Sequence, residues 1–244
     1  FDAGQVHQYL CHHVACHPTG WSLETYQNHL KTIPGLHTLV QNPFVLRLVC
    51  EALPTLVQGN STHTTTRTPL SRYAIYNVFT QQWFGKEQWR LISQESLATR
   101  HSFVQEVRDW CQSHAWQLLT LHQVVVTLTE QDSSVYRRAA PIRMLEAGKA
   151  QFIHKSILEY FAAKRLIDAL DTGVEGACAL ANHESWVGEQ GFLSFVADEI
   201  TPVRWVMGIV GLLSAVVASG AGRTESNIKA QIGWAAITGS ISWT

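Results

Sequence analysis

Apolar side chains recur three and four residues apart through most of this chain, which is the spacing of one helix face. This pattern predicts helices over residues 3–15, 22–33, 42–56, 71–92, 103–119 and 189–200, and further helical segments up to residue 241. In the third helix Asn42 suits the N-cap, Pro43 suits the first helical position, and Pro54 is expected to mark the end. Strands are predicted only over 124–130 and 150–153. The fold class is therefore mainly α with a minor β hairpin.

A polar stretch at residues 58–69 predicts an exposed linker loop. It separates a helical domain at 1–57 from a second domain at 70–171. In that second domain, helices followed by a small hairpin and a closing helix indicate a winged-helix arrangement. Residues 172–244 are helical at repeat-sized spacing without a strict repeat, which predicts a superhelix-like region.

The charge content limits the classes of partner. Only 15% of the residues are charged, against roughly 25% in an ordinary soluble domain, so part of the surface is expected to be covered by the rest of a larger protein. The 18 basic and 19 acidic residues give a formal charge of −1. Because no basic field is available to attract phosphates, we expect no nucleic-acid partner.

The cysteines predict a reducing compartment. Their number is odd and they are scattered through apolar contexts, which favours buried free thiols over a disulfide framework. They are Cys11, Cys16, Cys50, Cys111 and Cys178. No signal peptide opens the chain, which begins in mid-pattern, so we expect a cytoplasmic protein whose N-terminus lies upstream.

Residues 151–166, QFIHKSILEYFAAKRL, carry the most specific pattern. Ser156 and Glu159 have the spacing of a capping box, which predicts that a helix begins between His154 and Ser156. Backbone N–H groups and the dipole at a helix N-terminus favour an anion, and an imidazole there can donate to phosphate oxygens. A packing or capping role for His154 is the alternative.

This block resembles the winged-helix region of NACHT-type signal-transduction (STAND) NTPases, in which a histidine follows an apolar pair and precedes Glu-Tyr/Phe-Phe-Ala-Ala. The resemblance implies that His154 contacts the phosphate of ADP. Residues 39–54, LVQNPFVLRLVCEALP, resemble the first helical domain of that family, and imply that Pro43 packs against adenine. A segment opening the winged-helix domain matches at Arg72, Tyr76, Phe79 and Trp83, and the resemblance covers about residues 1–171.

The resemblance implies a regulatory segment of an ATP/ADP-dependent switch. In that family ADP holds the helical and winged-helix domains closed, and ATP releases them to oligomerise. The chain has no G-x-x-x-x-G-K-[ST] phosphate loop and no Walker B element, so we expect no catalysis from this segment alone. Mg²⁺ would be held only by an upstream phosphate-loop domain of the same chain, and a repeat domain would follow downstream.

The sequence raises four other interpretations. A nucleotide-independent helical scaffold that binds proteins through the part after residue 171 is the alternative function. The cluster CHHVACH at 11–17 invites a zinc site, but only His12 and Cys16 share a helix face and no second cluster supplies further ligands, so we expect no metal site. The uncharged stretch 205–222 is interpreted as a buried helix or helix pair rather than a membrane span. No hydrolase or redox motif occurs.

Overall fold

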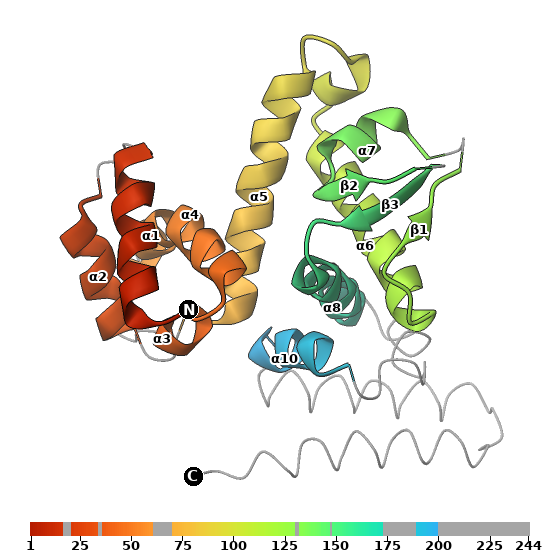
Figure 1. Cartoon of the computed structure of the whole chain (residues 1–244). Helices are drawn as coiled ribbons and strands as arrows, with labels where there is room; N and C mark the ends of the chain where they lie inside the picture. Colours follow the sequence, from red (N-terminus) through yellow and green to blue (C-terminus); the bar gives the residue numbers. More distant parts are fainter. Residues whose placement is uncertain are drawn as a thin grey trace, which may run out of the picture. The chain divides into compact units, whose positions relative to one another are not determined.

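The computed structural model describes residues 1–16, 21–33, 36–60, 70–129, 132–146, 148–172 and 189–199. These residues form a mainly helical protein with a small three-stranded antiparallel sheet (Figure 1). The mainly α fold class with a minor β element is thereby confirmed. The chain divides into two compact units, residues 1–107 with 133–141 and residues 108–132 with 142–244, and each is described by itself.

The first unit is helical. Its elements are α1 (Ala3–Cys16), α2 (Leu23–Thr32), α3 (Leu36–Leu39), α4 (Pro43–Asn60), α5 (Arg72–Leu91), the 3₁₀ turn η1 (Ser96–Thr99) and α7 (Ser134–Ala139). Helix α4 packs along α5, and α1 and α2 lie beside it (Figure 1). The core contains Leu46, Leu53, Tyr76 and Phe79, all nearly inaccessible to solvent. Apolar residues at helical spacing therefore form the core of this unit.

Helix α4 runs through Pro54, which corrects the prediction that this proline ends the helix. A proline lacks the N–H that would bond the carbonyl four residues back, here the carbonyl of Cys50. The hydroxyl of Tyr26, from α2, donates to that carbonyl at 3.1 Å, and Tyr26 is buried. Because the orphaned acceptor has a partner from another helix, α4 continues to Asn60. The predicted linker at 58–69 thus begins inside α4, and its residues 61–69 lie outside the described part.

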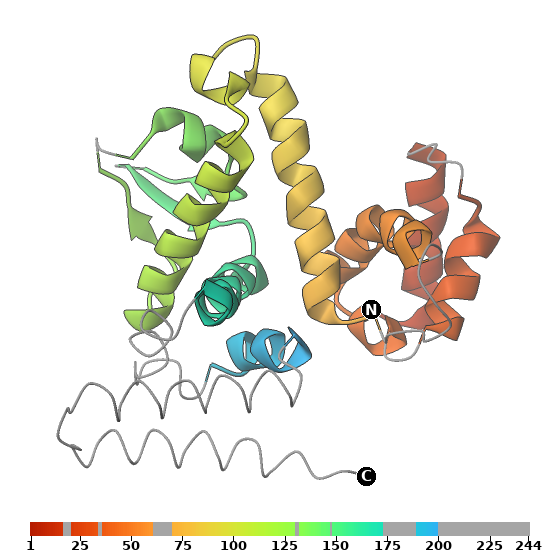
Figure 2. The same cartoon turned by 180° about the vertical axis from the view of Figure 1, so that it is seen from behind.

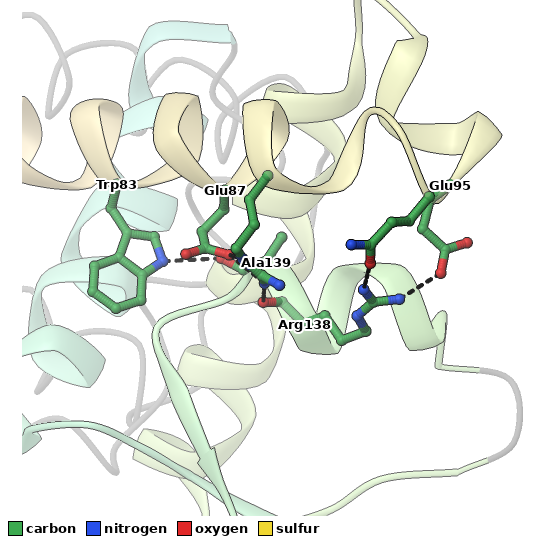
Figure 3. Close-up of polar contacts among 7 residues, drawn as sticks. Trp83, Glu87, Glu95, Arg138 and Ala139 are labelled. Atoms are coloured by element: carbon green, nitrogen blue, oxygen red, sulfur yellow. Dashed lines mark hydrogen bonds and ion pairs between the residues drawn. The ribbon is translucent and has the colours of Figure 1, made fainter.

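Polar contacts hold α7 to α5 within the first unit (Figure 3). The indole nitrogen of Trp83 donates to the carbonyl of Ala139 at 3.0 Å, and Arg90 donates to the carbonyl of Arg138 at 3.0 Å. The guanidinium of Arg138 in turn pairs with Glu95, next to η1. These bonds satisfy the carbonyl groups at the C-terminal end of α7, where a short helix has no further N–H groups of its own.

The second unit contains the sheet. Helix α6 (Phe103–Thr120) enters it from the first unit, and β1 (Val126–Thr127), β2 (Ile142–Met144), β3 (Lys149–Phe152), α8 (Lys155–Thr172) and α10 (Gln190–Glu199) follow. The strand order is β1-β3-β2, all antiparallel. Figure 1 shows the sheet in front of α6, and Figure 2 shows α6 in front of the sheet.

The sheet differs from its prediction in two respects. The strand expected over 124–130 is reduced to Val126–Thr127, which pair with Ala150 and Lys149 of β3. Strand β2 was not predicted, since its three residues are exposed or half-buried and show no apolar run. The turn before β3 places Gly148 at a φ of 70°, a conformation that suits glycine. The strand expected over 150–153 is confirmed as β3, one residue earlier.

Helices α8 and α10 pack closely together. The rings of Tyr160 and Phe195 are 5.8 Å apart in an edge arrangement, and both residues are fully buried. Phe192 of α10 also meets Trp116 of α6. The helix predicted over 189–200 is confirmed as α10. Residues 205–222 lie outside the described part, and within the part that is described no helix combines the length and apolar character of a membrane span.

The predicted domain boundaries stay a prediction. The division into units passes through the predicted domain at 70–171, because residues 70–107 and 133–141 belong to the first unit. The predicted second helical region at 172–244 is described only over 189–199 and its first residue.

Candidate functional site

The junction between β3 and α8 places His154 at the start of a buried helix. Phe152 ends β3, and α8 begins at Lys155. The carbonyl of His154 accepts the N–H of Ile157 at 3.0 Å, so His154 occupies the N-cap position. Its side chain is half-buried. The predicted start of the helix, between His154 and Ser156, is confirmed.

The cap itself differs from the prediction. Nδ1 of His154 accepts the backbone N–H of Ser156 at 3.2 Å and lies 2.6 Å from the Ser156 hydroxyl. Ser156 is therefore the second residue of the helix rather than its N-cap, and the capping box expected for Ser156 and Glu159 is wrong. An imidazole nitrogen can accept an N–H as a serine oxygen does, which is why His154 takes over this role.

The tautomer of His154 decides which ring nitrogen can donate. In the tautomer whose Nδ1 accepts the N–H of Ser156, the proton of the neutral ring lies on Nε2. In that tautomer the ring has an N–H donor at the N-terminus of α8, where the dipole favours an anion. Capping and donation use different nitrogens, and the two roles that the sequence left open are compatible.

Charged side chains surround this helix terminus. Nζ of Lys155 lies 3.2 Å from Oε2 of Glu189 and 3.6 Å from Oε1 of Glu159. The hydrogen bond to Glu189 is the main reason that the pKa of Lys155 is raised above its usual value. His122, two residues after the end of α6, lies 3.7 Å from the other oxygen of Glu189. Sequence reasoning missed Lys155 and Glu189; the one available signal was the lysine that directly follows His154.

A glycine allows α10 to approach this cluster. The carboxyl group of Glu159 is buried and lies where a Cβ atom of residue 191 would be. Only Gly191, in the first turn of α10, leaves room for it. The carboxylate of α8 thus lies beside the N-terminus of α10, where the helix dipole stabilises negative charge.

Pro43, the second predicted site residue, lies in the first unit, whereas His154 lies in the second. Asn42 caps α4 as predicted: Oδ1 accepts the N–H groups of Phe44 at 2.9 Å and Val45 at 3.3 Å. Pro43 follows at the first helical position, and its ring is exposed.

A helix cap and a cation–π contact hold the first turn of α5. Ser71 caps the helix by accepting the N–H of Ala74 at 3.0 Å. The guanidinium carbon of Arg72 lies 5.6 Å from the centre of the Tyr76 ring, which is a cation–π distance. Since Tyr76 is fully buried, this contact fixes the first turn of α5 against the core of the unit.

A hollow of about 300 Å³ lies among α1, α4 and α5 in the first unit. Arg47 and Lys86 both pair with Glu51 on its wall, at 3.1 and 3.6 Å. Burial raises the pKa of the thiol of Cys50, which lines the hollow, to about 12. Its charges are balanced by one another, and neither Pro43 nor His154 lines it.

The cluster at residues 11–17 lies on α1 up to Cys16, and His17 is outside the described part. Cys11 and Cys16 are exposed, which corrects the expectation of buried thiols, whereas Cys50 and Cys111 are buried. Sγ of Cys16 lies 3.7 Å from Nε2 of His12, so the predicted shared face is confirmed. In the described ranges no group of three or more histidine, cysteine or acidic side chains is arranged to hold a metal ion.

No protein-family model matches the chain, and no curated protein matches it.

Proposed function

We propose that this chain is the regulatory segment of a NACHT-like ATP/ADP-dependent signalling switch. It would contribute contacts to phosphate and adenine that hold the closed, ADP-bound state. The nucleotide would stabilise one of two arrangements of the parent protein by binding it more tightly than the other, and exchange of ADP for ATP would release it.

The geometry of His154 is the observation that carries this proposal. Its Nδ1 lies at the N–H of Ser156, and in the tautomer that accepts this N–H the ring proton lies on Nε2 at the N-terminus of α8. Lys155 lies at the same terminus, where it pairs with Glu159 and Glu189. A phosphate group there would meet an N–H donor and a helix dipole, and would compete with the two carboxylates for Lys155.

The first unit supports the remaining roles. The exposed ring of Pro43 has the rigid apolar surface that packing against a base requires, and Asn42 performs the capping that leaves it in place. Arg72 and Tyr76 pack on one another and organise α5 rather than contact nucleotide. Along the chain, the element order α6, β1, α7, β2, β3, α8 supports a winged-helix domain, with α7 belonging to the first unit and the strands to the second.

The proposal assigns catalysis to another part of the parent protein. A phosphate-loop domain upstream would cradle the phosphates and hold Mg²⁺, and a repeat domain would follow downstream. The parent would form homo-oligomers when activated, in the cytoplasm. ADP and ATP are the ligands, and this segment supplies a donor and an apolar contact but no nucleophile or general base.

The test measures ADP affinity in the full-length protein by isothermal titration. His154→Ala removes both the helix cap and the phosphate donor. His154→Asn retains a good cap, but its side chain is too short to reach the same phosphate. A hydrogen bond to a charged group contributes about 1.5–3 kcal/mol, so both variants should bind ADP roughly 10- to 100-fold more weakly.

The matched pair separates the two roles of the ring. If His154→Asn binds ADP as the unchanged protein does, His154 is a capping residue and the nucleotide role is lost. The chain would then be the alternative, a helical scaffold that binds protein partners independently of nucleotide. The observation that favours this second candidate is that the cap alone accounts for the ring's contacts with Ser156.

A further inference from the structure

Helix α1 carries two histidine–cysteine pairs, each four residues apart. Nε2 of His7 lies 3.6 Å from Sγ of Cys11, and Nε2 of His12 lies 3.7 Å from Sγ of Cys16. All four side chains are exposed. Residues four apart are neighbours on a helix surface, so each pair can point its two ligand atoms at one place.

These separations match a tetrahedral zinc site. With Zn–S bonds of about 2.3 Å and Zn–N bonds of about 2.0–2.1 Å, a tetrahedral angle places the sulfur and the nitrogen about 3.6 Å apart. The His7–Cys11 pair has this separation at one ring nitrogen, Nε2. In the His12–Cys16 pair Sγ lies 3.7 Å from Nε2 and 4.0 Å from Nδ1, so the ring of His12 has to rotate to direct a lone pair at Zn²⁺. The thiol proton leaves to solvent as the thiolate–zinc bond forms, and the imidazole nitrogen binds through its lone pair.

The His7 pair also has an outer partner that orients the ring. Nδ1 of His7 lies 2.7 Å from the side-chain amide of Gln27, on α2. Half a turn of that amide brings its oxygen to the same position, where it would accept the Nδ1–H of a metal-bound ring. Such a bond from the second ring nitrogen fixes the tautomer and orientation of metal-binding histidines.

Each pair supplies half of a site. Cys11 and Cys16 are five residues apart, which rotates them by about 140° around the helix, so the two pairs cannot share one ion. A pair leaves two of four zinc positions open, and the same pair of a second copy has the ligands that fill them. We propose that each pair is a half-site for Zn²⁺ that a second copy of this chain completes as a Cys₂His₂ centre. This inference is independent of the proposed nucleotide switch.

The two half-sites face different directions, and this predicts the assembly. A two-fold contact through one half-site closes at a dimer, whereas two such contacts on different faces link copies into longer assemblies. Zn²⁺ should therefore raise the mass of the chain beyond a dimer. Cys11→Ser and Cys16→Ser should each stop at the dimer, and the double variant should stay monomeric.

Co²⁺ is the spectroscopic probe for the ligands. The full chain, kept reduced without a thiol reagent, should develop a thiolate-to-Co²⁺ charge-transfer band and the d–d bands of tetrahedral cobalt, and Zn²⁺ should remove them. Each single serine variant should retain half of the charge-transfer intensity, and the double variant none. Light scattering with Zn²⁺, and then with a chelator, reports the mass.

The controls keep the outcome clear. Both cysteines are exposed, so serine should leave the helical circular dichroism unchanged. His37→Ala removes an exposed histidine from the same unit with no cysteine four residues away, and should change nothing. Absence of the band, its persistence in the double variant, or thiolate ligation without a change in mass would each overturn the proposal.

Discussion

Helices α4 and α8 have the same length, and each carries a local signal that points the wrong way. In α4 a proline indicates the end of the helix, and in α8 the spacing of a serine and a glutamate indicates a helix start at the serine. A residue from another helix, Tyr26, accommodates the proline, whereas the neighbouring His154 displaces the serine. In both helices the outcome depends on which side chain bonds the backbone group in question. Tyr26 bonds the carbonyl of Cys50, so α4 continues, and His154 bonds the N–H of Ser156, so α8 begins before the serine.

The largest expected effect concerns the hydrogen bond from Tyr26 to the carbonyl of Cys50, which compensates for Pro54 in α4. Tyr26→Phe leaves the ring in place but removes the hydroxyl that bonds the carbonyl of Cys50. That carbonyl is then buried without its donor, so the free energy of unfolding, measured in urea, should fall by about 1–3 kcal/mol.

A second substitution makes this test specific. In Pro54→Ala the new N–H at position 54 can bond the carbonyl of Cys50, as in a regular helix. Tyr26→Phe should then cost clearly less than it does beside Pro54. Equal costs in the two backgrounds would show that the hydroxyl of Tyr26 stabilises something other than the break in α4.

Much of the helical fold could be predicted because its signals are local. Asn42 and Pro43 start α4 where expected, since a cap and its helix lie within three residues of one another. The continuation past Pro54 could not be predicted, because the group that permits it, Tyr26, comes from a different helix. Strand β2 was missed for a related reason: only its pairing with β3 gives it regular structure.

The candidate site was predictable in position but not in detail. The pattern around His154 placed a helix start correctly, but the spacing of Ser156 and Glu159 indicated a capping box. That Nδ1 of His154 reaches the N–H of Ser156 is visible only in the structure. The ion pair from Lys155 to Glu189 joins positions 34 residues apart, and no sequence pattern indicates it. The pair of His7 and Cys11 could have been found, since its spacing equals that of His12 and Cys16.

The next effect concerns the N-caps of α4 and α8. Loss of an N-cap typically costs about 1 kcal/mol, so Asn42→Ala and His154→Ala should lower the free energy of unfolding by similar amounts. His154→Asn should cost only a few tenths of that, because asparagine is itself a strong cap. A cost of His154→Ala far above that of Asn42→Ala would mean that the ring stabilises the fold by more than capping.

The smallest expected effect on the free energy of unfolding concerns Lys155, the charged first residue of α8, where α4 has Pro43. Lys155 is more than half exposed, so Lys155→Met should lower the free energy of unfolding by less than about 1 kcal/mol at neutral pH. The pKa of Lys155 is raised in the folded protein, chiefly by Glu189. Its contribution is therefore complete below the unfolded value of about 10.4 and is lost as pH rises through the folded value.

The difference between the unchanged protein and Lys155→Met should accordingly close at alkaline pH, and also shrink in high salt, which screens exposed pairs. Every other titrating group is common to the two proteins and cancels in this difference. Lys149→Met, at a lysine for which the described residues show no ion pair, serves as the matched control and should show neither trend. A difference that persists unchanged above the folded pKa would show that the aliphatic stem of Lys155, rather than its charge, stabilises the start of α8.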